Sequence, residues 1–228
     1  MLTHQHSVRL FLPFRSHVHF YMEMPYFFSQ LTRPPHDPQS LHPALLSAIS
    51  VSACCVAGGR LGLFKKHFMN QTRAALQKSL EDADRLLHFL WASVVYGSFL
   101  TNTACLKEAY ATISACARFA FACGLDGITM LNRMSAPDCP LLPPPVNEEE
   151  ARDRINLAHA IYMADRSLAM ISGYPSVFST ASAILDRDMI STASSPSEGT
   201  GSVQSVETVV EVSSWPKALS VLFTNISN

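Results

Sequence analysis

Charge is scarce in this chain, and the scarcity narrows what the chain can bind. Only 15 % of its 228 residues are charged, the formal net charge is −1 and the sequence pI is about 6.7. A domain that holds DNA by itself usually presents a basic face, because neutralisation of phosphates dominates the affinity. The composition therefore gives no electrostatic footprint for nucleic acid. Apolar residues, at 48 %, suffice for one sizeable core.

Long hydrophobic runs are also missing. Apolar stretches are interrupted by His, Lys, Arg or Gly within about a dozen residues, short of the roughly 20 that a membrane-spanning helix needs. At the N-terminus, Arg9 precedes an apolar patch broken by Pro13 and Arg15, which fits neither a secretory signal nor an Arg-rich transit peptide. We therefore expect a soluble, intracellular chain with no membrane partner.

No common catalytic motif is present. The sequence has no G-x-S-x-G, no H-E-x-x-H, no Walker-type loop and no G-x-G-x-x-G. The Gly-rich turn at 58–62 has no preceding strand and no Gly-Lys-Ser/Thr after it, so it does not predict a phosphate site. Asp153 and Asp165 are not spaced to share one helix face. We expect no enzyme activity and no cofactor in this chain.

Metal ligands are few and badly spaced. The pairs His4/His6 and His17/His19 lie two residues apart without a third type of ligand, which is weak support for a metal site. No C-x-x-C spacing occurs, and we interpret the cysteines as small buried hydrophobic residues rather than as disulfides or zinc ligands. The six are Cys54, Cys55, Cys105, Cys116, Cys123 and Cys139.

The clearest feature that is present is a long helix over residues 148–172. Pro143–Pro145 end the preceding segment, Asn147 can act as N-cap, and Glu150 has the spacing of a capping box. Gly173 is a natural left-handed terminator. Two adjacent apolar rows are wider than a surface stripe and predict a central helix. The rows are Ala151, Ile155, Ala158, Tyr162 and Ala169, and Leu157, Ile161, Ala164, Leu168 and Ile171.

Helical periodicity and turn signals predict four further helices, over 42–57, 63–80, 83–100 and 103–123. Pro43 suits a helix start, Gly58 suits a helix end, and Asp82 and Asp84 are placed to begin the next helix. We expect an all-α fold, an irregular multi-helix bundle of antiparallel helical hairpins.

Three regions are expected along the chain. Residues 1–40 are rich in His, Pro and aromatic residues and predict an irregular lead-in that packs on the core. Residues 41–178 form the helical domain. Residues 179–228 contain the Ser/Thr/Gly-rich run STASSPSEGTGSVQS and predict a partly disordered tail.

The pair Asp165-Arg166 is unusual because it stands among apolar residues. Neighbouring residues point about 100° apart on a helix, so these two need separate partners. One interpretation is a structural ion pair or a cap to another helix. The other is a ligand contact or a switch between two helix packings. With Tyr162 on the same helix, they are the candidate structural or effector contacts.

Three collinear segments resemble one protein family. D-R-S-L-A-M followed by I-S-G-Y-P-S, at 165–176, resembles the signature in the regulatory middle homology region of fungal zinc binuclear-cluster transcription factors. H-P-A-L-L-S-A-I, at 42–49, is similar to a second stretch of this fungal-specific, xylanolytic-activator type domain. The third is the end of a helical hairpin, with Ala117, Arg118, Ala120, Gly124 and Leu125. The lead-in L-F-L-P-F-R-S-H-V-H-F also resembles the family.

The resemblance implies a nuclear domain that regulates transcription. Family members bind DNA through an N-terminal six-cysteine cluster that holds two zinc ions, and this chain carries no such pattern. Zinc and DNA binding are therefore family attributes that these residues cannot perform. Members usually continue with an acidic Trp-Pro motif and further helices. Here Trp215-Pro216 comes late, so we expect a truncated or divergent end.

Two hypotheses for function follow. In the first, the chain is a regulatory domain that acts through protein partners or senses a small-molecule effector, with DNA bound only through the missing zinc-cluster segment. In the second, it is a helical scaffold or degenerate gene fragment with no activity of its own. An upstream open frame that encodes the six-cysteine cluster favours the first.

Overall fold

Helix α8 (Glu148–Ser172) begins and ends where its sequence signals predict. The Asn147 side chain accepts a hydrogen bond from the Glu150 backbone N–H at 2.8 Å, and the Glu150 carboxylate accepts one from the Val146 N–H at 3.1 Å. These bonds satisfy donors that a helix start leaves unpaired. Gly173 ends the helix with a left-handed φ of 71°, which is costly for any residue with a Cβ.

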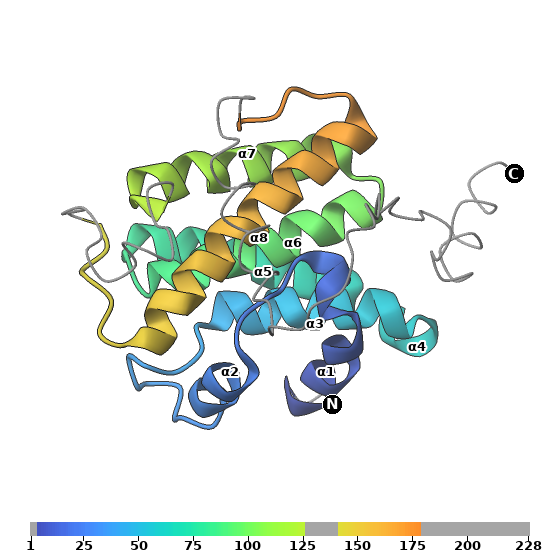
Figure 1. Cartoon of the computed structure of the whole chain (residues 1–228). Helices are drawn as coiled ribbons and strands as arrows, with labels where there is room; N and C mark the ends of the chain where they lie inside the picture. Colours follow the sequence, from blue (N-terminus) through green and yellow to red (C-terminus); the bar gives the residue numbers. More distant parts are fainter. Residues whose placement is uncertain (1–3, 126–140, 179–228) are drawn as a thin grey trace, which may run out of the picture. The chain divides into compact units, whose positions relative to one another are not determined.

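The structure is a computed structural model that describes residues 4–125 and 141–178. The chain divides into two units, residues 1–192 and 193–228, and all described residues belong to the first. These residues form helices and no strand, so the all-α prediction is confirmed (Figure 1). Before α8 the elements are α1 (His4–Phe11), the 3₁₀ helix η1 (Leu12–Val18), α2 (Met24–Leu31), α3 (Pro43–Ala57), α4 (Gly59–Gly62), α5 (Lys65–Glu81), α6 (Leu86–Asn102) and α7 (Leu106–Ala122).

The central helix is α6 and not α8. Every residue from Leu90 to Leu100 is buried, and α6 contacts α3, α5, α7, α8 and η1. By contrast, α8 lies across α6 and α7 and leaves one face outside, where Met170 is 86 % exposed (Figure 1). The prediction of a central α8 was therefore wrong. Its two apolar rows include four alanines, which fill little volume, whereas α6 places Trp91, Tyr96 and Phe99 in the core.

Helices α6 and α7 form a close hairpin at a glycine. A Cβ atom on Gly97 would lie 2.3 Å from Cδ1 of Ile113, so only glycine allows the two helices to approach this closely. Beside this contact, Glu108 of α7 accepts two hydrogen bonds from Arg73 of α5 at 2.8 Å and one from the Tyr96 hydroxyl at 3.0 Å. This bidentate pair ties α5, α6 and α7 together.

The N-terminal segment packs on the core as expected but is not irregular. It forms α1, η1 and α2, with Pro13 and Pro25 in the first turns of η1 and α2, where a missing N–H costs nothing. Phe20 lies edge-on to Trp91 of α6 at 5.2 Å between ring centroids. Pro13 and Pro25 therefore lie at helix starts, although prolines suggest helix breaks when only the sequence is considered.

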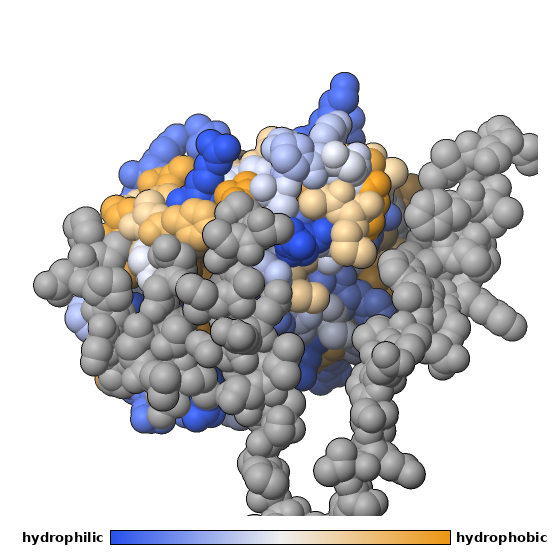
Figure 2. Space-filling model, turned by 45° about the horizontal axis from the view of Figure 1, so that its top comes forward, coloured by the Kyte–Doolittle hydropathy of each residue, from blue (hydrophilic) through white to orange (hydrophobic). Residues whose placement is uncertain are grey.

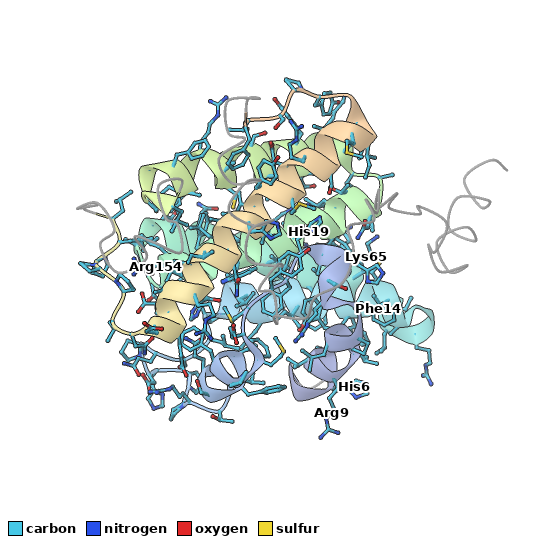
Figure 3. The ribbon with its side chains drawn as sticks, in the orientation of Figure 1. His6, Arg9, Phe14, His19, Lys65 and Arg154 are labelled. Atoms are coloured by element: carbon cyan, nitrogen blue, oxygen red, sulfur yellow. The ribbon has the colours of Figure 1, made fainter. Side chains whose placement is uncertain are left out.

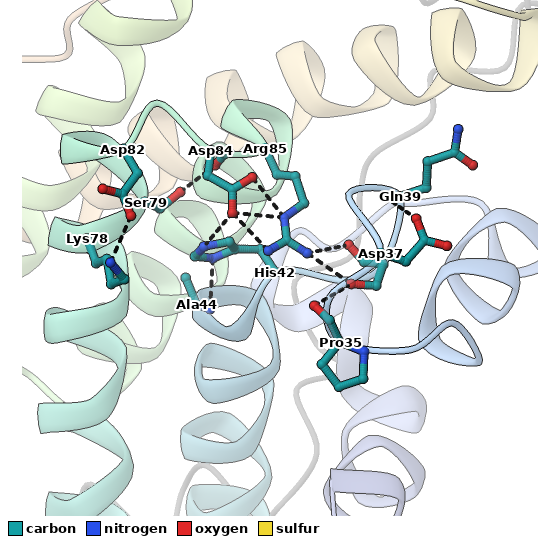
Figure 4. Close-up of polar contacts among 11 residues, drawn as sticks. Pro35, Asp37, Gln39, His42, Ala44, Lys78, Ser79, Asp82, Asp84 and Arg85 are labelled. Atoms are coloured by element: carbon teal, nitrogen blue, oxygen red, sulfur yellow. Dashed lines mark hydrogen bonds and ion pairs between the residues drawn. The ribbon is translucent and has the colours of Figure 1, made fainter.

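A polar network, rather than an aspartate cap, forms the corner between α5 and α6 (Figure 4). The Arg85 guanidinium binds the Asp84 carboxylate at 2.8 Å and donates to the carbonyl and hydroxyl oxygens of Ser40. The buried His42 ring lies 3.5 Å from Asp84 and accepts the Ala44 N–H. The expectation that Asp82 and Asp84 begin the helix was wrong. Asp84 instead joins this corner to the start of α3, and α6 begins at Leu86.

The described cysteines are free, and one departs from the expectation of burial. Cys54, Cys116 and Cys123 are buried and Cys55 is half-buried, but Cys105 is exposed at the turn before α7. Cys139 lies outside the described residues. On the face drawn in Figure 2, hydrophobic areas are separated by hydrophilic ones. In the part of the chain that the structure describes, no helix has the length and apolar character to cross a membrane.

Candidate functional site

Asp165 joins the last turns of α8 to the segment that follows the helix. Its side chain is 2 % exposed. The carboxylate accepts hydrogen bonds from the Ser176 hydroxyl and from the backbone N–H groups of Val177, at 3.0 Å, and Phe178, at 3.4 Å. We call this arrangement the α8 clasp: Asp165 together with residues 173–178. It fastens the end of α8 to the chain that leaves it.

Local sequence explains how the chain turns back to reach Asp165. Gly173 reverses direction in the left-handed conformation, and the Ser172 hydroxyl accepts the Tyr174 N–H at 3.1 Å. The Tyr174 ring then meets the ring of Tyr110 at 4.9 Å between centroids, near the start of α7. The segment continues along α7 until the Phe178 ring meets that of Phe121 at 5.0 Å (Figure 1). Residues 173–178 thereby cover part of α7.

The other two candidate residues have different places. The Tyr162 ring meets the Phe178 ring at 5.4 Å, so Tyr162 belongs to the clasp. Arg166 is exposed on the outer side of α8 and takes no part in it. The sequence argument correctly separated Asp165 from Arg166. Among the described residues, Asp165 accepts its hydrogen bonds from the chain directly after its own helix, and no ion pair or cap to another helix is present there.

The donors of the clasp replace the water that the Asp165 carboxyl group loses on burial. A buried carboxylate is tolerated when several donors replace its water, and two backbone amides with a hydroxyl do so here. The same bonds satisfy backbone N–H groups that would otherwise be buried without partners. The geometry holds two segments together and presents no reactive group to a substrate.

A second buried carboxylate, which the sequence did not single out, lies near the other end of α8. Asp153 is 1 % exposed, and its Oδ2 accepts a hydrogen bond from Nε1 of Trp91 at 3.0 Å. Its Oδ1 has no hydrogen-bond partner among the described residues. Burial raises the Asp153 pKa to about 7, against the effect of the indole N–H, which lowers the pKa. This contact links α8 to the central helix α6.

The neighbouring polar group on α6 is His88. Its Nε2 and the side-chain oxygen of Gln30 on α2 are 3.1 Å apart, and both residues are buried. Burial lowers the His88 pKa to about 3, with a smaller effect in the same direction from Arg85. The three-residue spacing of His88 and Trp91 was the available sequence signal, since both then face one side of α6. The α2–α6–α8 junction thus contains buried polar contacts inside an aromatic core.

The fold places His17 and His19 in different environments. His17 is exposed, whereas His19 is half-buried with its Nδ1 3.3 Å from the Tyr21 hydroxyl. Burial, with a smaller effect from His159 in the same direction, lowers the His19 pKa to about 4 (Figure 3). Within residues 4–125 and 141–178, no group of three or more His, Cys, Asp or Glu residues could hold a metal ion.

Comparison of the chain with protein-family models, with curated proteins and with solved structures gave no match. Functional assignment therefore depends on the residues and contacts described above.

Proposed function

We propose that this chain is the regulatory middle homology domain of a fungal zinc-cluster transcription factor. In this proposal it works in the nucleus, controls DNA-templated transcription through protein partners or a small-molecule effector, and performs no catalysis. Zinc and DNA are bound by a zinc-cluster segment in such factors, and none of the residues described here takes that role.

The α8 clasp is the observation that carries the proposal. The two parts of the signature that resembles the family, D-R-S-L-A-M and I-S-G-Y-P-S, are adjacent in sequence but play distinct parts in the clasp. Asp165 of the first part accepts the hydroxyl of Ser176 in the second, and Gly173 supplies the turn between them. A signature whose polar residues contact each other has a physical reason to occur as a unit. The all-α fold supports the proposal at a coarser level.

A reporter assay tests the proposal directly. The full chain is fused to a DNA-binding domain of known specificity and expressed in a fungal cell that carries the matching reporter gene. A regulatory domain that recruits or excludes partners changes reporter expression several-fold relative to the DNA-binding domain alone. Asp165→Ala removes the change, because the clasp no longer holds residues 173–178.

The competing function, an inert helical scaffold, gives the opposite result. In that case the fusion accumulates to the same level, stays in the nucleus and leaves the reporter unchanged. Circular dichroism of the purified chain shows whether it is folded, so an unchanged reporter with a helical spectrum overturns the proposal. Arg166→Ala is the matched control for Asp165→Ala, because Arg166 is the next residue on α8 but lies outside the clasp.

A further inference from the structure

The turn that joins α3 to α5 exposes large apolar side chains next to basic ones. Leu63 is 81 % exposed, Phe64 49 % and Val56 43 %. Arg60 and Lys66, which flank them in sequence, are exposed as well. We call these five residues the α4 tip. Exposed apolar side chains that gather in one place and are bordered by charge mark interaction sites more often than single exposed ones do.

The backbone of the tip is fixed, so its side chains are displayed on a folded support. Gly58 and Gly59 turn the chain with φ values of 59° and 51°, and the Gly58 N–H donates to the Cys54 carbonyl at 3.2 Å. The Phe68 N–H donates to the Phe64 carbonyl at 3.0 Å, which continues α5 into the tip. Figure 1 shows α4 at the far end of α3. An ordered apolar surface loses little conformational entropy when it binds.

The charge around the tip has one sign. The sequence contains no Asp or Glu between Asp37 and Glu81. Lys65 lies over the Phe99 ring, 5.3 Å from its centroid, on the same side of the molecule as the tip (Figure 3). Among the described residues, no ion pair involves Arg60 or Lys66. Further along α5, Arg73 and Lys78 are paired with Glu108 and Asp82. Arg60 and Lys66 are therefore available to a partner, whereas the cations further along α5 are engaged with carboxylates.

We propose that the α4 tip binds an acidic amphipathic helix of a partner protein. Apolar side chains of that helix at positions i, i+3, i+4 and i+7 cover Leu63, Phe64 and Val56, and its carboxylates face Arg60 and Lys66. Apolar anchors at the centre with charged groups at the rim are the usual arrangement of such interfaces. The proposed contact involves only the tip, so it does not depend on whether the chain regulates transcription.

Two other classes of partner fit the tip less well. A membrane-binding segment typically carries Trp or Tyr at the headgroup level, and residues 54–68 contain neither. Nucleic acid is held through its phosphates, so binding to it gains little from exposed Leu and Phe side chains. The combination of apolar anchors with exposed cations matches an acidic, apolar protein segment best.

Fluorescence anisotropy of a defined probe tests the proposal. The probe is a dye-labelled synthetic helix with Leu and Phe at i, i+3, i+4 and i+7 and Glu at most other positions. We expect saturable binding to the full chain, and a shuffled peptide of equal composition binds more weakly. Leu63→Ser with Phe64→Ser weakens the Kd by about tenfold or more, the loss expected when large apolar contacts are removed. Arg60→Glu with Lys66→Glu weakens it by a similar factor and removes its salt dependence.

Matched controls come from the opposite end of α5. Leu80 is 49 % exposed, like Phe64, and Lys78 is an exposed cation about 18 Å from Lys66 along the helix axis. Leu80→Ser and Lys78→Glu leave the Kd within about twofold, because surface changes away from a contact have small effects. Circular dichroism confirms that each variant is folded.

Several outcomes overturn the proposal. They are the absence of saturable binding, equal binding of the shuffled peptide, and equal weakening by the control variants. Tighter binding to phosphatidylserine vesicles or to duplex DNA, lost on changing Arg60 and Lys66, assigns the tip to that partner instead. A failed reporter assay with a positive peptide titration removes the proposed function and leaves this inference in place.

Discussion

The two ends of α8 each bury one aspartate, and the two carboxylates differ in their environments. Asp165 and Asp153 are 2 % and 1 % exposed and lie about 18 Å apart along one helix. Asp165 has a hydroxyl and two backbone amides as donors, whereas Asp153 has one indole N–H and an oxygen without a partner among the described residues. Two carboxyl groups that are equally buried thus differ in how many donors replace their water.

The largest expected effect is the pH dependence that Asp153 gives to stability. Its pKa rises from 3.8 to about 7 in the folded chain, so the folded state binds the proton more tightly than the unfolded state. Stability from this group is complete below about pH 4 and is lost as the pH rises to about 7. The loss is on the order of 4 kcal/mol at 1.36 kcal/mol per pKa unit. We expect Asp153→Asn to be more stable than the wild type at pH 8 by up to this amount and equal to it near pH 4.

Urea denaturation at several pH values measures this difference. Buried histidines act in the opposite direction in the same pH range. Burial lowers the pKa of His19 to about 4 and of His88 to about 3, so their contribution is lost as the pH falls below 6.5. The difference between wild type and Asp153→Asn removes this background. A difference that does not change with pH shows that Asp153 is charged in the folded chain.

Removal of the Asp165 carboxylate comes second. Asp165→Ala leaves the N–H groups of Val177 and Phe178 and the Ser176 hydroxyl without their acceptor. An unsatisfied buried donor costs about 1–3 kcal/mol, so we expect a loss of about 2–4 kcal/mol in the free energy of unfolding. Urea denaturation at pH 7 measures it. An unchanged midpoint means that the clasp is open in solution and that Asp165 is available to a ligand.

Ser176→Ala removes one donor of the clasp and leaves the two amides in place. The two remaining amide donors compensate in part for the lost hydrogen bond, so we expect a loss of about 1–2 kcal/mol in the free energy of unfolding. Hydrogen exchange at the Val177 and Phe178 amides should speed up more than exchange in α6. Equal acceleration everywhere indicates global destabilisation without a local role for Ser176.

Arg166→Ala should have the smallest effect. Arg166 follows Asp165 directly, yet it is exposed and outside the clasp. Substitutions at such surface positions usually change stability by less than about 0.5 kcal/mol. Thermal and urea denaturation of Arg166→Ala and Asp165→Ala, measured side by side, compare the loss in the free energy of unfolding at two neighbouring residues. A loss comparable to that of Asp165→Ala contradicts the described contacts.

Local signals made much of the fold predictable. The Asn147 cap and the Gly173 terminator act within a few residues, and α8 has the bounds predicted from them. The other four predicted helices begin and end within three residues of those in the structure. Pro13 and Pro25 misled because a proline that breaks one helix can equally start the next, and only packing decides between the two.

The site was less predictable, because it depends on contacts between segments. The burial of Asp165 could be inferred from its apolar neighbours, but its partners could not. Asp153 has charged neighbours in the sequence: Glu149, Glu150, Arg152 and Arg154. Such a charged sequence is typical of a solvent-exposed first turn of a helix. The burial of Asp153 follows from the position of Trp91 on another helix, and no pattern within α8 reports that.

Because Trp91 contacts Asp153, tryptophan fluorescence should report on the interior of the chain. The Trp91 indole is fully buried and lies edge-on to Phe20, an apolar setting in which indole emits at shorter wavelength than in water. A proton on Asp153 changes the field at the indole N–H, so the emission should follow the charge of that carboxyl group. The chain has two tryptophans, and Trp215→Phe leaves Trp91 as the single emitter. The emission wavelength of Trp91 then reports when α6 and α8 separate.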